Sequence, residues 1–307
     1  MSLETLKENN KHVLNCAVQD ASGLNDFQKI PNQVMIAIPR VGIERFRIPM
    51  LIEHKDGTVL NHDVEASMFV YLEAHKTGAN MSRFCSILQD EGLKKPINTK
   101  FISELLGRYR KDLRDYKDEK LIPQAELMLK FKYPVKQKSL KSGNWGWQYY
   151  EVEIKGVQTK DQTLIKYVLG YEYSSTCPCS LSMSKQYEAA YREGTETEGT
   201  GIASAHSQRS LATVEATVSV DHIFHFEDLI DHMRMAIPTE TQSLVKRVDE
   251  QAFAILNGEH PMFVEHASRR ISVQLNSDAR IIDWNVKIEH FESLHSHNAV
   301  AYISKSQ

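Results

Sequence analysis

The sequence predicts an α+β fold in which one order of elements, two strands followed by helices and two further strands, occurs twice. Residues 211–220 read Leu-Ala-Thr-Val-Glu-Ala-Thr-Val-Ser-Val, a β-branched run typical of a strand. Residues 99–116 repeat apolar side chains at three- and four-residue steps with charges on the other face, which is typical of a helix. The same order of patterns appears on both sides of residue 158, although the two halves share no visible residue identity.

The first unit is predicted to span residues 33–157, after a largely polar N-terminal arm at residues 1–32. Its strands are expected at residues 34–38, 46–52, 64–73, 125–131 and 147–154, and its helices at residues 81–90 and 99–116. Asp56-Gly57 is a turn signal between the early strands.

The second unit is predicted to span residues 158–307. Its strands are expected at residues 164–173, 211–220, 280–290 and 299–304, and its helices at residues 226–235, 241–256 and 261–275, with Pro261 suited to a first helical turn. Antiparallel half-sheets of this kind have edges to hide, which favours an oligomer or a closed barrel.

Composition excludes several classes of protein. A net charge of -3 argues against a dedicated nucleic-acid binder. Four cysteines in 307 residues are too few for a disulfide scaffold, so we expect a reducing cytoplasm. Residues 1–19 are mostly polar and do not resemble a signal peptide, and no stretch approaches the roughly 18 apolar residues of a membrane span.

The stretch from residue 175 to 210 carries most of the chemistry. Cys177 and Cys179 lie on either side of a proline, and His206 is followed by Arg209. A thiolate and an imidazole suit a borderline metal such as zinc, and a three-ligand site would leave one coordination position open for catalysis. Two buried structural thiols are the alternative, whereas a disulfide across one residue has unsuitable geometry.

Two further carboxylates lie in predicted helices, and each has a structural alternative. Glu250 follows Lys246 by four residues, so the two form either part of a site or a solvated ion pair. Glu265 comes early in its helix, where it either binds a ligand, interacts with the helix dipole or pairs with Arg269.

The loop between the last two strands carries Glu292, His295 and His297, which form either an acid–base set or a polar surface turn. The two histidines also have a spacing that suits metal ligands. Arg83 in the first half is either a phosphate contact or a surface charge. Residues 184–192 predict a short helix, and the glycine-, threonine- and glutamate-rich residues 193–201 predict a surface loop. That loop is either a lid or an inert insertion, and the insertion is favoured.

Five motifs occur in one order along the chain: Ser-Thr-Cys-Pro-Cys-Ser (175–180), His-x-Gln-Arg-Ser (206–210), the pair Val-Asp-Glu (248–250) and Phe-Val-Glu (263–265), Met-Ser-Arg-Phe (81–84), and Glu-Ser-Leu-His-Ser-His-Asn (292–298). Together they resemble GTP cyclohydrolase IB over about residues 30–304. The resemblance implies a tandem tunnelling fold and a homotetramer with active sites at subunit interfaces. It also implies that residues 185–201 are inserted, because the family usually has a shorter connection before the histidine.

The resemblance implies a role for each matching residue. Cys177, His206 and Glu250 match the metal ligands, and Cys179 matches a cysteine needed for catalysis. Glu265 matches the carboxylate that binds the guanine edge. Further polar groups are expected to transfer protons (Glu292, His295, His297) or to bind the triphosphate (Arg209, Arg83, Lys246).

The implied reaction is the metal-dependent opening of the GTP imidazole ring, with release of formate and closure to 7,8-dihydroneopterin triphosphate, the first step of tetrahydrofolate synthesis and a source of queuosine precursors. The metal is expected to be zinc, manganese or another divalent ion. Two alternatives stay open. One is a tunnelling-fold nitrile reductase of queuosine synthesis, and the other is an interaction module stabilised by zinc on Cys177, Cys179, His206 and His297.

Overall fold

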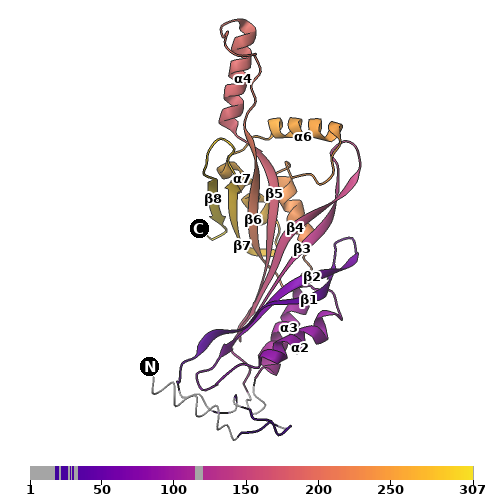
Figure 1. Cartoon of the computed structure of the whole chain (residues 1–307), viewed down its shortest axis with the longest axis vertical. Coiled ribbons are helices and arrows are strands. Elements are labelled where there is room, and N and C mark those ends of the chain that lie inside the picture. The colour runs from indigo at the N-terminus through magenta and orange to yellow at the C-terminus, as the bar shows by residue number, and fades with distance from the viewer. Residues whose placement is uncertain are drawn as a thin grey trace.

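The computed structural model describes residues 18–20, 22–26, 28, 30, 34–114 and 120–306. Its centre is one sheet of eight strands, each antiparallel to its neighbour and ordered as they occur in the chain (Figure 1). The strands are β1 (Ile38–Glu53), β2 (Val59–Leu72), β3 (Ala125–Lys138), β4 (Trp145–Gln158), β5 (Thr163–Thr176), β6 (Ser207–Val218), β7 (Ile281–His290) and β8 (Ala299–Ser304).

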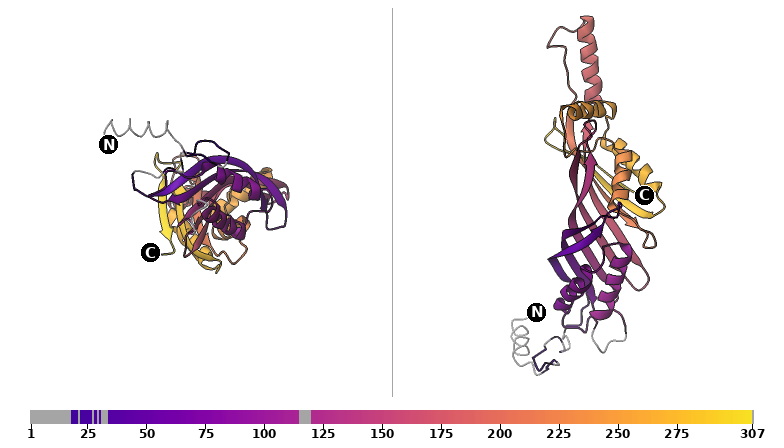
Figure 2. Two further views of the ribbon diagram at one scale, coloured as in Figure 1. Left: turned by 90° about the horizontal axis from the view of Figure 1, so that it is seen from below. Right: turned by 90° about the vertical axis from the view of Figure 1, so that its right-hand side faces the viewer.

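The helices are α2 (Met81–Gly92), α3 (Thr99–Asp112), α4 (Pro178–Glu193), α5 (Phe226–Ala236), α6 (Arg247–Glu259) and α7 (Val264–Asn276). Figure 2 shows that the helices of the body lie on one side of the curved sheet. Helices α2 and α3 pack on strands of the first half, whereas α5 packs on β5 and α7 on β7 and β8. No helix in the described ranges is long and apolar enough to cross a membrane.

Alternation along the strands separates the two faces of the sheet. In β6, Ala212, Val214 and Ala216 are buried under the helices. On the other face, Trp147 and Tyr149 of β4 and Tyr302 of β8 are exposed. Successive side chains of a strand point to opposite faces, so this pattern gives the sheet one covered face and one bare face.

The predicted α+β arrangement is confirmed, with two strands, helices and two strands in each half, as expected for the tandem tunnelling fold. The predicted unit boundary falls at the end of β4, just before the turn at residues 159–162. Most of the predicted arm at residues 1–32 lies outside the described residues.

Several predicted bounds are wrong. Residues 34–37 are not in a strand, and β1 begins at Ile38 and continues through two register shifts. Residues 241–246 are not helical because Gln137 binds the carbonyl of Thr241 and the N–H of Ser243. Helix α7 begins at Val264, so Pro261 precedes it. Helix α4 is longer than the predicted helix at residues 184–192 and begins at Pro178, beside the two cysteines.

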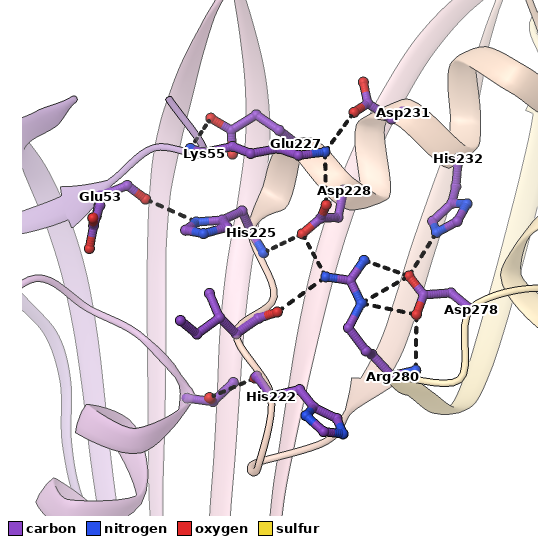
Figure 3. A network of polar contacts seen from close by, with 12 residues as sticks. Glu53, Lys55, His222, His225, Glu227, Asp228, Asp231, His232, Asp278 and Arg280 are labelled. Atoms are coloured by element: carbon purple, nitrogen blue, oxygen red, sulfur yellow. Dashed lines mark hydrogen bonds and ion pairs between the residues drawn. The ribbon is translucent and has the colours of Figure 1, made fainter. Parts of the chain in front are cut away.

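A polar network joins the two halves of the chain away from the ends of the sheet (Figure 3). Arg280 binds Asp278 at 2.7 Å and Asp228 at 3.2 Å. Asp228 caps α5 through the N–H of His225 and also binds Lys55 of the first half at 2.9 Å. Each of these charged groups meets an opposite charge, so the network acts as a structural joint.

Candidate functional site

Polar side chains replace the apolar core at one end of the second half. The register pairs Ser175 of β5 with Gln208 of β6, and pairs Ser210 of β6 with both Tyr173 of β5 and His290 of β7. All five side chains are buried on the helix-covered face. Buried polar groups need partners, and these residues form a buried polar platform at the end of the core, in which Ser175 bonds to Ser210 and Gln208 while Tyr173 bonds to His290.

Cys177 and His206 lie next to each other where the chain leaves β5 and enters β6. The N–H of Cys177 donates to the carbonyl of His206 at 3.2 Å, and the N–H of His206 donates to Ser180 Oγ at 3.2 Å. Cys177 is the N-cap of α4, and Cys179 is exposed in its first turn. The three described cysteines are all unpaired thiols.

Gln208 links His206 to the platform. Its Oε1 lies 3.0 Å from His206 Nδ1, and its Nε2 donates to Ser175 Oγ at 2.9 Å and to Glu292 Oε1 at 3.5 Å. Ser175 and Ser210 share a hydrogen bond of 2.8 Å. Glu292 Oε2 lies 3.8 Å from His206 Nδ1. A carboxylate, an imidazole and an amide therefore meet beside the two cysteines.

A hollow of about 660 Å³ opens beside this group. Its wall includes Ser207, Gln208 and Arg209 of β6, Glu172 of β5, and Glu250 of α6. Arg209 is exposed and lies 3.8 Å from Glu172. A volume in the range of 300 to 1,000 Å³ is typical of sites for small ligands.

Asp249 fixes the start of α6, the helix that carries Glu250. Its buried carboxylate accepts hydrogen bonds from the N–H groups of Lys141 and Ser142, in the β3–β4 turn, and from the N–H of Lys246. These bonds, with Ser142 contributing most, lower the pKa of Asp249 well below its ordinary value. The β3–β4 turn therefore holds α6, and with it Glu250, against the hollow.

His290 closes the platform on the β7 side. Its Nε2 lies 2.9 Å from the hydroxyl of Tyr173, and only 2% of its surface is exposed. Burial lowers the pKa of His290 to about 4, while the nearby charge of Glu265 opposes this shift. His290 is therefore neutral at pH 7, and Glu265, in the first turn of α7, lies close enough to interact with it.

Comparison with known proteins shows the family of this chain. Residues 24–301 match the sequence model of a family described as "Type I GTP cyclohydrolase folE2". A "GTP cyclohydrolase FolE2" from Cereibacter sphaeroides is 38% identical over 288 residues, which cover 92% of this chain and 76% of that protein. One from Ruegeria sp. is 39% identical over 287 residues, covering 92% and 74%. This chain belongs to the FolE2 family.

Solved structures with a similar arrangement include a uricase from Arthrobacter globiformis, with a TM-score of 0.48 and 8% sequence identity over 89% of this chain and 95% of that one.

The structure of this FolE2-family chain brings most of the predicted site residues to one end. His295 and His297 stack with their ring centroids 4.9 Å apart in the loop that begins after β7, the same loop that holds Glu292. Lys246 is the N-cap of α6. Arg83 is the exception. It lies on α2, at the opposite end of the chain from α4 and α6 (Figure 1), and its guanidinium donates to the carbonyls of Asp112 and Arg114.

The predicted metal ligands are brought together only in part. Within the described ranges, no three His, Cys, Asp or Glu side chains converge in a way that could hold a metal ion. Cys177 and His206 adjoin, whereas Glu250 is exposed on α6 at the wall of the hollow. A thiol and an imidazole suit a divalent metal chemically, and the two residues that carry them are joined through their backbones. Glu250 as the third ligand stays a prediction.

The predicted insertion is a projecting hairpin. No side chain of α4, which is described along its whole length, is buried, and Figure 1 shows α4 extending beyond the body. Residues 194–205 run back along it, because the Tyr187 hydroxyl donates to the carbonyl of Glu198 and accepts from the N–H of Gly201. These contacts hold residues 193–201 against α4.

Sequence reasoning assigned no role to the platform residues Tyr173, Ser175, Gln208, Ser210 and His290. One signal was available in β6. Gln208 and Ser210 continue the alternation of Ala212 and Val214, so they are polar residues at positions that face the core. Polar side chains in such positions either satisfy one another or serve a site.

Proposed function

We propose that this chain is a GTP cyclohydrolase I, which converts GTP and water into 7,8-dihydroneopterin triphosphate and formate. Family membership over residues 24–301 supports this reaction. The observation that carries it is the adjoining Cys177 and His206, next to a hollow of about 660 Å³ at the polar end of the core. This reaction is the first step of tetrahydrofolate synthesis.

The proposed metal ligands are Cys177, His206 and Glu250, and the proposed metal is zinc or manganese. When bound, a divalent ion supplies Lewis-acid chemistry and makes water a nucleophile at neutral pH. The backbone hydrogen bond between Cys177 and His206 supports the first two ligands. Glu250 completes the set either through a shift of α6 or from a neighbouring subunit.

The chain's own residues take the remaining roles. Glu265 accepts hydrogen bonds from the guanine edge, where a carboxylate can bind two N–H groups at once. Arg209 and Lys246 bind the triphosphate at the wall of the hollow and the start of α6. Proton transfers fall to Cys179, in the first turn of α4, and to Glu292, His295 and His297, in the loop between β7 and β8.

The proposed assembly is a homotetramer with sites at subunit interfaces. The bare sheet face and the two edge strands, β1 and β8, give a neighbouring subunit surfaces to cover. Arg83 can contribute to the triphosphate site only from another subunit, because it lies at the far end of its own chain. The three unpaired cysteines support a reducing compartment, and we propose the cytoplasm.

The reaction is tested by incubating the protein with GTP and Mn²⁺ or Zn²⁺. We expect one equivalent of formate for each dihydroneopterin triphosphate, which becomes a fluorescent pterin after oxidation. Chelation should abolish this activity and leave the chain folded. NADPH consumption with a nitrile substrate, and no formate from GTP, would identify a nitrile reductase instead.

The interaction module is less well supported. It requires four converging ligands, and no such group of three or more exists among the described residues. A module held together by zinc would unfold when the metal is removed. Thermal unfolding with and without a chelator therefore separates it from an enzyme.

A further inference from the structure

Gln208 is the most connected side chain of the platform, and it lies between a proposed metal ligand and a proposed proton-transfer group. We propose that Gln208 is a positioning residue that holds His206 with its proton on Nδ1, so that Nε2 is the nitrogen offered to the metal. This inference rests on the metal site of the proposed function, and it concerns a residue to which that function assigns no role.

The orientation of the Gln208 amide follows from its other partners. A carboxylate offers acceptors, so the amide atom 3.5 Å from Glu292 Oε1 is the NH₂ group. The same NH₂ group donates to Ser175 Oγ at 2.9 Å, which uses its second hydrogen. The amide oxygen therefore faces His206 Nδ1 at 3.0 Å.

The tautomer of His206 follows from the amide. Gln208 Oε1 can only accept a hydrogen bond, so His206 Nδ1 must carry the proton that it receives. A neutral imidazole has one N–H and one lone pair, which leaves the lone pair on Nε2. Metal-binding histidines are commonly oriented in this way by a hydrogen bond to their other nitrogen.

The surroundings hold this arrangement in place. Gln208 is 8% exposed, and Ser175 and Ser210 are fully buried. The strand register sets Ser175 opposite Gln208, and the Ser175–Ser210 hydrogen bond anchors the serine. A flipped amide would point its oxygen at Glu292 Oε1, so two acceptors would face each other and the contact would become repulsive.

Gln208 also keeps Glu292 away from His206. Glu292 Oε2 lies 3.8 Å from His206 Nδ1, beyond hydrogen-bond distance, because the amide of Gln208 occupies that nitrogen. Without the amide, the carboxylate would be free to bind Nδ1 itself. Glu292 would then be drawn from the position in which its second oxygen is available to a substrate.

The first experiment measures the tautomer in the full-length, metal-free wild-type protein. Nitrogen-15 NMR of the histidine rings, with the His206 signals assigned by their loss in His206→Gln, distinguishes a protonated from an unprotonated ring nitrogen. We expect the proton on Nδ1. A proton on Nε2 overturns the proposal directly, whatever any variant does.

The second experiment separates the acceptor from the donor of the amide. Gln208→Met keeps the length of the side chain and removes both groups. We expect it to weaken Zn²⁺ or Mn²⁺ binding by about 10- to 100-fold, measured by competition with a chelator, because Glu292 can then bind Nδ1 and turn the ring. Gln208→Glu keeps an acceptor toward Nδ1, so it should retain the Nδ1 proton and bind metal more tightly than Gln208→Met.

The matched control is Gln158→Met. Gln158 also lies in a strand and donates to the carbonyl of Ser103 and to Thr163, at the other end of the sheet. The Gln158→Met substitution should change neither the His206 tautomer nor the metal affinity. Wild-type metal affinity in Gln208→Met would overturn the proposal.

The outcome is independent of the reaction itself. A wild-type protein that binds metal and carries the Nδ1 proton, but makes no pterin from GTP, would refute the proposed function and leave the role of Gln208 intact. Melting temperatures of all variants show whether any loss reflects unfolding. If Gln208→Met does not fold, Ser175→Ala replaces it, with an expected loss of metal affinity smaller than 10-fold and the Nδ1 proton retained.

Discussion

The two halves of the chain connect equivalent strands in different ways. In the first half, β1 and β2 are joined by a tight turn in which Gly57 has a φ of 82°. In the second half, the connection from β5 to β6 runs through α4 and its returning segment, residues 177–206, with Cys177 at its start and His206 at its end. The strands pair along most of their length in both cases, so the sheet does not require the longer connection.

The β3–β4 connection of the first half is likewise a simple turn, whereas the equivalent β7–β8 connection carries polar site candidates. The β3–β4 turn closes with a hydrogen bond from the N–H of Ser139 to the carbonyl of Asn144. The β7–β8 connection carries Glu292, His295 and His297. Loops on a rigid scaffold can change without disturbing the core, and they often carry the chemistry of a protein. The first half has the shorter connections, and all the proposed site residues except Arg83 lie in the second half.

The largest effect is expected from the cysteines of the long connection. Cys179→Ala should lower kcat by about 10² to 10⁴-fold if its thiol takes part in proton transfer, while metal content is retained. Cys177→Ala should lose both metal and turnover, because it removes a proposed ligand. Metal analysis and formate release on the same samples separate the two roles.

The matched control is Cys85→Ala, on α2 of the first half. It should keep metal content and turnover, since this thiol belongs to the scaffold. Undiminished activity in Cys179→Ala would remove the functional contrast between the two halves.

Lowering the pH is expected to destabilise the folded protein through a buried histidine in each half. Burial lowers the pKa of His290 to about 4, against about 6.5 in an unfolded chain, so the unfolded state binds more protons between these values. The contribution of His290 to stability is complete above pH 6.5 and is lost as the pH falls to 4, up to about 3 kcal/mol. Tyr173 and Glu265 are the titratable groups that interact with it.

His290→Gln should flatten the dependence of unfolding free energy on pH between 6.5 and 4, as measured by urea denaturation. His62 of β2, whose pKa burial also lowers, is the counterpart in the first half. His62→Gln should leave the part of the slope caused by His290 in place. An unchanged slope in His290→Gln would show that this histidine has the same pKa in the folded and unfolded protein.

A smaller effect is expected at the joint between the halves (Figure 3). Arg280→Met removes one partner of Asp278 and one partner of Asp228, and we expect it to lower the free energy of unfolding by about 1 to 2 kcal/mol. Turnover per folded molecule should not change, because the joint lies away from the hollow. Arg47→Met breaks an exposed pair with Asp63 and should have no measurable effect on stability.

The smallest effect on stability is expected from the projecting hairpin. Replacing residues 182–203 with a short glycine–serine linker removes exposed side chains for the most part and keeps both cysteines. The melting temperature should change by less than about 2 °C, because surface changes away from buried groups are nearly neutral. Loss of cooperative unfolding in calorimetry would instead make α4 part of the folded core.

The sequence by itself determined the order of strands and helices, the α+β class and the motifs of the family. Those features depend on local periodicity and on short runs such as residues 175–180 and 206–210, and neighbouring residues are enough to define them. Residues 34–37 and 241–246 show the limit of such patterns. Their apolar or helical character was overruled by where β1 begins and by the hydrogen bonds of Gln137.

Only the tertiary structure decided which polar groups meet. Ser175 and Gln208 are 33 residues apart in the chain and face each other because the register of β5 and β6 places them there. Glu250 lies at the hollow because Asp249 binds a turn of the first half, and Arg83 lies far away because α2 covers the opposite end of the sheet. Contacts of this kind depend on strand register and helix docking, which arise from packing over the whole chain.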